Sequence, residues 1–346
     1  MKSRKMICFC ILTMVMLITA NNILAETAAS DPIGFTAENA VVTEPQGQLF
    51  CYDVTYRNLH KAYKPETFNS SGVKSREYQR LDGRETEDWI NYLYEDGAEL
   101  CIPTGLSLMY GDTRREQYSQ VLTYLRSEPE AAECVEIEGF SLEEAQKKAD
   151  AFIAGLGIEY LEPDTAVSLS HDYLDKITGD MREAYVGMDK VRYFDTFTTD
   201  IDAYYLTYRQ VLNGIKTAGD PQAAVVITRD GIAYLEMAFV IDGINDKQPV
   251  SEGLTRQAAA DLCAERCRKE FSLLPGNINI SNEIAEISVV NYFAFNESGE
   301  DEYRASLFPC WFLKGTQTFF KDGEAAGRKH IRDLYRIQDG QWFYAN

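Results

Sequence analysis

An Asp-Gly pair between two apolar runs is the sequence feature that most restricts how this chain folds. Asp230-Gly231 separates Val225-Val226-Ile227 from Ile232-Ala233-Tyr234-Leu235. A two-residue hairpin turn needs positive φ angles, which Gly adopts without steric cost, so the pattern predicts an antiparallel β-hairpin. Asp339-Gly340 predicts a second hairpin close to the C-terminus. Antiparallel sheet is therefore expected in the second half of the chain.

Other segments are rich in Tyr, Val and Ile or alternate between apolar and polar residues, which is typical of strands with one buried face. Strands are expected at 49–56, 98–110, 118–125, 203–211, 223–228, 286–295 and 304–313. The segment 118–125 also fits a helix. Strand is thus the commonest predicted element.

One helix has an unusually clear start. Ser141 and Glu144 have the spacing of a capping box, in which side chains satisfy backbone N–H groups that the helix leaves unpaired. Apolar residues then recur at helical spacing up to Gly157, which suits the left-handed position after a helix. The pattern predicts an amphipathic helix whose small residues allow close approach to a sheet.

A second helix is predicted over 255–271. Aligning Thr255 with Ser141 places Ala259 on Ala145, and in both copies the helix precedes predicted strands. This is a weak internal repeat. It favours a duplicated unit, although chance also produces matches of this length.

Together these elements predict an α+β fold, in which each of two antiparallel sheets is crossed by an amphipathic helix, behind a β-rich N-terminal region. The expected segments are a signal peptide at 1–25, a flexible lead-in at 26–45, a β-rich N-terminal domain at 46–140, and helix-over-sheet modules at 141–250 and 251–346.

The N-terminus has the pattern of an export signal. Three basic residues among the first five precede an apolar run over 6–20, which is short for a membrane span. We expect cleavage after Ala25 and a secreted or cell-envelope-associated protein without a transmembrane span. The alternative is an uncleaved N-terminal anchor, because Ile23 is bulkier than the cleavage pattern prefers.

The charge of the chain argues against one class of partner. With 34 Lys and Arg residues against 54 Asp and Glu residues, the formal net charge is -20. Such a surface repels a phosphate backbone, so no nucleic-acid partner is expected.

Six cysteines follow the predicted signal, and an even number in an exported protein permits disulfides. These candidate disulfide residues are Cys51, Cys101, Cys134, Cys263, Cys267 and Cys310. Their pairing stays open. Cys263 and Cys267 lie four residues apart on the predicted helix, where core packing, a bridge from one of them to Cys310, and reactive or metal-binding thiols are alternatives.

Residue patterns typical of catalysis or metal binding are weak. His60, His171 and His330 share no metal-ligand spacing. Ser170-His171-Asp172 contains the residue types of a catalytic triad, but neighbours in sequence need spatial partners from elsewhere to act as one. We therefore predict no catalytic residue, no metal site and no cofactor.

Two segments resemble known domains. Tyr208-Arg209-Gln210-Val211-Leu212-Asn213-Gly214-Ile215, with the following Asp230-Gly231 turn, resembles the strand and turn of PepSY-type and thermolysin-propeptide-type domains. Leu307-Phe308-Pro309-Cys310-Trp311-Phe312 is similar to their Pro-x-Trp strand. The resemblance covers roughly residues 141–346 and implies a cystatin-like, non-catalytic extracytoplasmic module. It departs from propeptides because no His-Glu-x-x-His pattern follows.

The leading functional hypothesis is an exported non-catalytic binding or regulatory module that acts on an extracytoplasmic protein or peptide. Tyr204, Tyr208 and Trp311 are the candidate partner-binding residues, although cross-strand packing also explains the tyrosines. An exposed sheet edge is a second candidate surface. The alternatives are an envelope hydrolase that uses carboxylates not visible as a motif, and a peptidase inhibitor.

Overall fold

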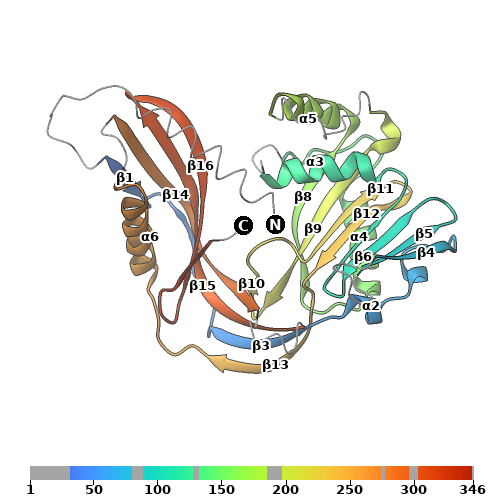
Figure 1. The fold of residues 1–346 in the computed structure, drawn as a ribbon, viewed down its shortest axis with the longest axis horizontal. Helices are drawn as coiled ribbons and strands as arrows, with labels where there is room; N and C mark the ends of the chain where they lie inside the picture. Colours follow the sequence, from blue (N-terminus) through green and yellow to red (C-terminus); the bar gives the residue numbers. More distant parts are fainter. Residues whose placement is uncertain are drawn as a thin grey trace. The chain divides into compact units, whose positions relative to one another are not determined.

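The computed structural model describes residues 32–79, 89–127, 132–184, 197–273, 277–295 and 303–344. The chain divides into two compact units (Figure 1). Unit 1 takes its described residues from Met1–Glu44, Glu252–Val289 and Cys310–Asn346, and unit 2 takes them from Pro45–Ser251 and Val290–Pro309. Both units therefore combine segments that are distant in sequence.

A nine-stranded sheet forms the centre of unit 2. The strand order is β10-β9-β11-β12-β7-β6-β5-β4, and β8 also pairs with β9. The strands are β4 (Val73–Gln79), β5 (Trp89–Tyr94), β6 (Glu99–Thr104), β7 (Ser107–Gly111), β8 (Leu161–Leu169), β9 (Ala203–Leu212), β10 (Ile215–Lys216), β11 (Ala223–Thr228) and β12 (Gly231–Ala238). Strands β11 and β12 form the hairpin predicted at Asp230-Gly231, with Thr228 opposite Gly231.

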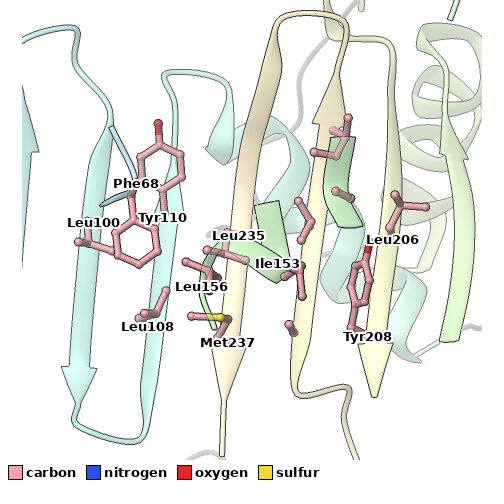
Figure 2. Packing of buried hydrophobic residues seen from close by; sticks show 14 of the residues in the cluster. Phe68, Leu100, Leu108, Tyr110, Ile153, Leu156, Leu206, Tyr208, Leu235 and Met237 are labelled. Carbon is pink, nitrogen blue, oxygen red and sulfur yellow. The ribbon is translucent and has the colours of Figure 1, made fainter. Parts of the chain in front are cut away.

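Helices cover both faces of this sheet. The other elements that lie entirely in unit 2 are α2 (Leu59–Ala62), α3 (Arg115–Ser127), α4 (Leu142–Gly155), α5 (His171–Ala184), the 3-10 helices η1 (Pro65–Thr67) and η3 (Thr199–Ile201), and the antiparallel pair β3 (Phe50–Tyr56) and β13 (Ile241–Pro249). Helix α4 packs on one face, where Ile153 and Leu156 meet strand residues such as Leu206 and Leu235 (Figure 2). Helices α3 and α5 share a core with the opposite face.

Strand β11 shows why the sheet has two cores. Val225 and Ile227 point into the core under α4, whereas Ala224 and Val226 point into the core under α3 and α5. Because successive side chains of a strand alternate between faces, a strand buried on both faces has a continuous apolar run. That requirement explains the sequence Ala-Ala-Val-Val-Ile.

Unit 1 contains helix α6 and most of a second sheet. Its elements are β1 (Ile33–Thr36), β2 (Val41–Thr43), α6 (Arg256–Glu270), β14 (Ile278–Phe295) up to Val289, β15 (Arg304–Lys321) from Cys310, β16 (Glu324–Arg336) and β17 (Trp342–Tyr344). The strand order is β1-β14-β15-β16-β17, and β2 pairs with β14 beyond the end of β1. Strands β1 and β2 run parallel to β14, whereas β15, β16 and β17 are joined by antiparallel pairing.

The predicted fold of two sheets, each crossed by one helix in a cystatin-like manner, is wrong. The structure is 50% strand and 23% helix, and it is dominated by one sheet of eight strands and one of nine. Strands β4 to β7, expected as part of a separate N-terminal region, join β12 through β7. Alternation in sequence marks a strand but carries no information on which distant strands it pairs with.

Local predictions are confirmed where short-range chemistry determines them. Ser141 accepts a hydrogen bond from the Glu144 N–H (3.2 Å) at the start of α4, and Thr255 caps α6 in the same way. Gly157 has the expected positive φ of 62°. The segment 118–125 belongs to helix α3, the alternative to a strand, and the described part of the expected lead-in contains β1 and β2.

The predicted signal peptide at 1–25, including the cleavage position after Ala25, lies outside the described residues. None of the helices in the described ranges combines the length and the apolar composition of a transmembrane span.

Candidate functional site

A groove of about 700 Å³ lies along one side of α6 in unit 1. We call it the α6 groove. Residues between 256 and 268 of α6 form one wall, residues between 35 and 42 form the other, and Ile287 of β14 also lines it. Every lining residue belongs to unit 1. The groove therefore depends on how α6 and the β1–β2 segment are held.

A buried ion pair holds α6. Asp333 of β16, which is 1% exposed, accepts hydrogen bonds from Arg266 Nε (2.9 Å) and Cys263 Sγ (3.3 Å). Burial disfavours the guanidinium charge, but the carboxylate of Asp333 outweighs it and raises the pKa of Arg266, which stays charged. A charged hydrogen bond of this kind is directional, so it fixes the rotation of α6.

The two buried thiols of α6, Cys263 and Cys267, have pKa values that are shifted in opposite directions. The pKa of Cys263 is raised by its hydrogen bond to Cys267, by burial and by Asp333. The pKa of Cys267 is lowered by that same hydrogen bond and by the positive charge of Arg266, although burial opposes this. Cys263 is thus the thiol that keeps its proton and donates it to Asp333, whereas Cys267 accepts a hydrogen bond from Arg266 Nη2 (3.6 Å).

A side-chain network holds the opposite wall. Asn282 of β14 donates from Nδ2 to the backbone oxygen of Gly34 (2.9 Å), and Gln317 of β15 donates to Asn282 Oδ1 (2.6 Å). Asn282 and Gln317 are both buried. Because buried amides need partners, this network fixes the position of β1 on β14.

The β1–β2 segment is an interrupted edge strand. Thr36 pairs opposite Glu283 and Val41 opposite Glu286, and the chain makes a turn between them. Among the described residues, β2 pairs only with β14. Val41 is 68% exposed and Val42 is 37% exposed, so the edge beside the groove is apolar and uncovered by the described part of the chain.

The charged groups of the groove are three carboxylates and two guanidiniums. Glu38, Asp261 and Glu265 line it and are exposed. Arg256 and Arg268 also line the groove, and the guanidinium of Arg256 pairs with Glu44 at 3.0 Å. Between these groups, small and apolar side chains such as Ala260 and Ala264 form the α6 wall. The arrangement combines an apolar surface with carboxylates that attract a cation.

The three residues predicted as a binding face lie inside the protein. Tyr204 and Tyr208 are 0% and 2% exposed in the core under α4, where the Tyr208 hydroxyl donates to Asp150 (2.8 Å). Trp311 is 6% exposed in unit 1 and donates from Nε1 to the backbone oxygen of Leu254 (2.7 Å). Both tyrosines pack in a hydrophobic core, which agrees with the alternative explanation given for them.

The six candidate disulfide cysteines are present as thiols. Cys263, Cys267 and Cys310 are buried in unit 1, and Cys101 is buried in unit 2. Cys134 is exposed and Cys51 is partly buried. The structure therefore gives Cys263 and Cys267 core positions, which is one of the alternatives that the sequence left open.

The sequence does not predict one pair of side chains that the fold brings together. His171 Nδ1 lies 2.8 Å from Asp202 Oδ1, which supplies the spatial partner that Ser170-His171-Asp172 lacks in sequence. No hydroxyl or thiol of the described residues hydrogen-bonds to His171 Nε2, so this pair does not form a nucleophilic triad. Within the same ranges, no cluster of three or more His, Cys, Asp or Glu side chains is arranged as a metal site.

The chain is similar in fold to a solved structure, that of an uncharacterized protein from Eubacterium rectale ATCC 33656. The two share 13% sequence identity, the alignment covers 92% of each chain, and the TM-score is 0.59. At this identity the likeness concerns the fold alone. No family model matches the chain, and a search of curated proteins finds no match.

Proposed function

We propose that this protein is an exported, non-catalytic binding module, and that its α6 groove holds an extended segment of an extracytoplasmic protein. The segment adds as a strand to β2. The observation that carries the proposal is the exposed, uncharged edge of β2 directly beside a groove whose other wall is α6. Strand addition uses backbone hydrogen bonds for affinity and alternate side chains for specificity.

The composition of the edge favours this site over the other sheet. Proteins protect open edges with charged residues, and β4, which ends the nine-stranded sheet, carries Lys74, Arg76 and Glu77. Strand β2 has the sequence Val-Val-Thr. An unprotected edge of this kind is a template for pairing, so its exposure is consistent with a partner that covers it.

The side chains of the groove indicate the chemistry of that partner. Apolar residues on one face of an added strand would contact Ala260 and Ala264, whereas a Lys or Arg between them would meet Glu38, Asp261 and Glu265. The net charge of -20 also attracts basic segments from a distance, in a manner that salt weakens. The expected partner segment is extended and apolar, with a central basic residue.

Synthetic peptides test the proposal. The probe is a blocked nine-residue peptide that alternates valine and threonine around one central lysine. It should bind more tightly than the same peptide with a central glutamate, and alternate N-methylation should abolish binding because it removes donors to the edge. Fluorescence anisotropy at two salt concentrations measures the affinities. Equal binding of all three peptides would contradict strand addition.

A matched pair of variants locates the site. Ala264→Leu adds three side-chain carbons at the groove and should weaken binding of the lysine peptide by about tenfold, which equals about 1.4 kcal/mol. Lys269→Leu introduces the same side chain at an exposed α6 position that does not line the groove; because it also removes a positive charge, the affinity should stay the same or rise slightly. If the two variants bind equally, the α6 groove is not the binding site.

A charge reversal tests the carboxylates. Glu265→Lys should weaken binding of the lysine peptide and strengthen binding of the glutamate peptide, because the sign of the central contact changes. The affinity ratio of the two peptides should therefore shift by about tenfold or more. A loss of both affinities by the same factor would indicate a damaged groove instead of a charge contact.

A further inference from the structure

A second groove, of about 640 Å³, lies within unit 2. We call it the His171 groove. It is lined by 135–139, 170–172, Thr199, Asp202 and Arg229. The segments that meet here come from the loop before α4, the start of α5, the region of η3, and the β11–β12 turn. The groove is therefore built by the tertiary fold and not by one local motif.

Asp202 is the buried anchor of the His171 groove. Its side chain is 6% exposed, and its Oδ1 accepts hydrogen bonds from the backbone N–H of His171 (2.7 Å) and from the His171 ring at Nδ1 (2.8 Å). The other oxygen, Oδ2, accepts no hydrogen bond from the residues that the structure describes. A carboxylate oxygen that lines a groove without a donor is an acceptor available to a ligand.

The groove has an excess of negative charge. Glu136, Glu138, Asp172 and Asp202 line it, against the single guanidinium of Arg229. That guanidinium donates a hydrogen bond to the backbone oxygen of Glu138, whereas the side chain of Asp172 is 90% exposed. With His171 neutral, the lining groups sum to a charge of about -3, which favours a cationic ligand.

His171 modulates this charge. Its hydrogen bond to Asp202 raises the pKa of the ring above the ordinary value, with further contributions from the charges of Asp202, Asp172 and Asp175, while burial opposes them. The groups that face or surround the ring are Asp172 and Asp175 from α5, Asp202 from the η3–β9 region, and Glu136, Glu138 and Arg229 across the groove. When protonated, Nε2 lies 3.6 Å from Asp172 Oδ1 as an internal counter-ion.

We propose that the His171 groove binds the cationic head group of a basic side chain, a lysine ammonium or an arginine guanidinium, and that protonation of His171 weakens this binding. The ligand cation takes Asp172 and Asp202 Oδ2 as its partners. A protonated His171 competes for Asp172 and adds a repelling charge. The site is in unit 2 and does not depend on the α6 groove.

The sign of the pH dependence follows from this competition. Below the pKa of His171 the ring carries a positive charge, and the ligand binds weakly. As the pH rises through that pKa, which lies above the ordinary value of about 6.5, the charge is lost and the affinity increases. A lysine head group remains protonated across this range, so the change belongs to the protein.

An NMR titration with N-acetyl-lysine methylamide tests the inference. The full chain without its predicted signal is labelled with ¹⁵N, and N-acetyl-norleucine methylamide is the neutral control. Saturable amide shifts should appear in residues 135–139 and 170–172 with the lysine probe and not with the control. The affinity at pH 8.5 should be about five- to tenfold higher than at pH 5.5. Shifts confined to 256–268 would support the α6 groove and overturn this inference.

Three variants separate a built site from general attraction to an anionic protein. Asp172→Asn should weaken the lysine probe by about tenfold, whereas Asp180→Asn, at an exposed position of α5 outside the groove, should change its affinity less than twofold. His171→Gln should remove the pH dependence and retain binding at both pH values. Equal effects of Asp172→Asn and Asp180→Asn, or an unchanged pH profile in His171→Gln, would overturn the proposal. Melting temperatures confirm that each variant is folded.

Discussion

Helices α4 and α6 begin in the same way and end in different surroundings. Both are capped by a hydroxyl side chain, and both bury small residues. In α4 the buried residues Ala145, Ala149 and Ile153 pack against the apolar strands β9 and β11. In α6, Cys263 and Cys267 lie beside the Arg266–Asp333 ion pair, and Ala260 and Ala264 line an open groove.

The difference shows that one local pattern serves two purposes. Apolar packing covers α4 along its stripe, so that α4 is part of a core. A directional charged contact holds α6 at one side, and on its other side Ala260 and Ala264, which are 6% and 7% exposed, line the floor of a groove. Small residues therefore bring a sheet close in the first case and leave space for a ligand in the second.

The largest loss of stability that this comparison predicts comes from breaking the Arg266–Asp333 ion pair of α6. Arg266→Met should destabilise unit 1 by about 3 kcal/mol, because it leaves the buried Asp333 without its counter-ion. Native-state hydrogen exchange measures this by region. Amides of α6 should lose protection while those of α4 keep theirs. Equal loss in both helices would mean that the two units unfold as one.

A matched pair of alanines provides the next test. Ala149→Leu should cost about 2 kcal/mol, because Ala149 is fully buried against the sheet and a larger side chain overpacks the core. Ala264→Leu should cost less than about 0.5 kcal/mol, because its side chain enters the groove. Urea unfolding measures both. Similar costs at the two positions would break the distinction between core helix and groove wall.

The capping residues should behave alike in the two helices. Ser141→Ala and Thr255→Ala each remove a hydroxyl that accepts one backbone N–H at 3.2 Å, so each should cost about 1 kcal/mol. Thermal unfolding of the two variants measures this. A much larger cost at one cap would show that its side chain has a role beyond helix initiation.

A small loss of stability is expected when the hydroxyl of Tyr208, on strand β9 under α4, is removed. Tyr208→Phe removes the hydrogen bonds of its hydroxyl with Asp150 and Gln146 but keeps the buried ring, so it should cost about 1 kcal/mol or less. Burial raises the pKa of Tyr208, as does Asp150, and the hydroxyl therefore contributes stability below about pH 10. That contribution should decrease progressively as the pH rises from about 10 towards the higher pKa of Tyr208 in the folded state, and it should be absent from the variant.

The parts of the fold that the sequence predicts are those determined over short distances. Caps at Ser141 and Thr255 and turns at Asp230-Gly231 need only neighbouring residues, and they are found as expected. The membership of the sheets depends on pairs such as β7 with β12, whose strands are more than a hundred residues apart. Periodicity cannot specify such pairs, which is why the predicted fold class fails.

The candidate sites were hidden for the same reason. Tyr204 and Tyr208 have the alternation of an aromatic surface, but β9 is buried on both faces, which the strand pattern alone does not distinguish. Val41 and Val42 lie in a segment expected as a lead-in, and only their pairing with β14 makes them an edge. Asp202 lies in a different segment of the chain from His171, and no rule of sequence spacing connects the two residues.

The pairing of β1 and β2 with β14 has a consequence for the order of folding. Strand partners such as Ile33 and Ile280 are 247 residues apart in sequence, and closing so long a loop is slow and entropically costly. In a chain made from its N-terminus, unit 2 has most of its strands before β14 exists. The groove wall formed by β1 and β2 is then among the last parts to assemble. Any chaperone or partner that acts on the nascent protein therefore meets Val41 and Val42 of β2 before they have a sheet to join.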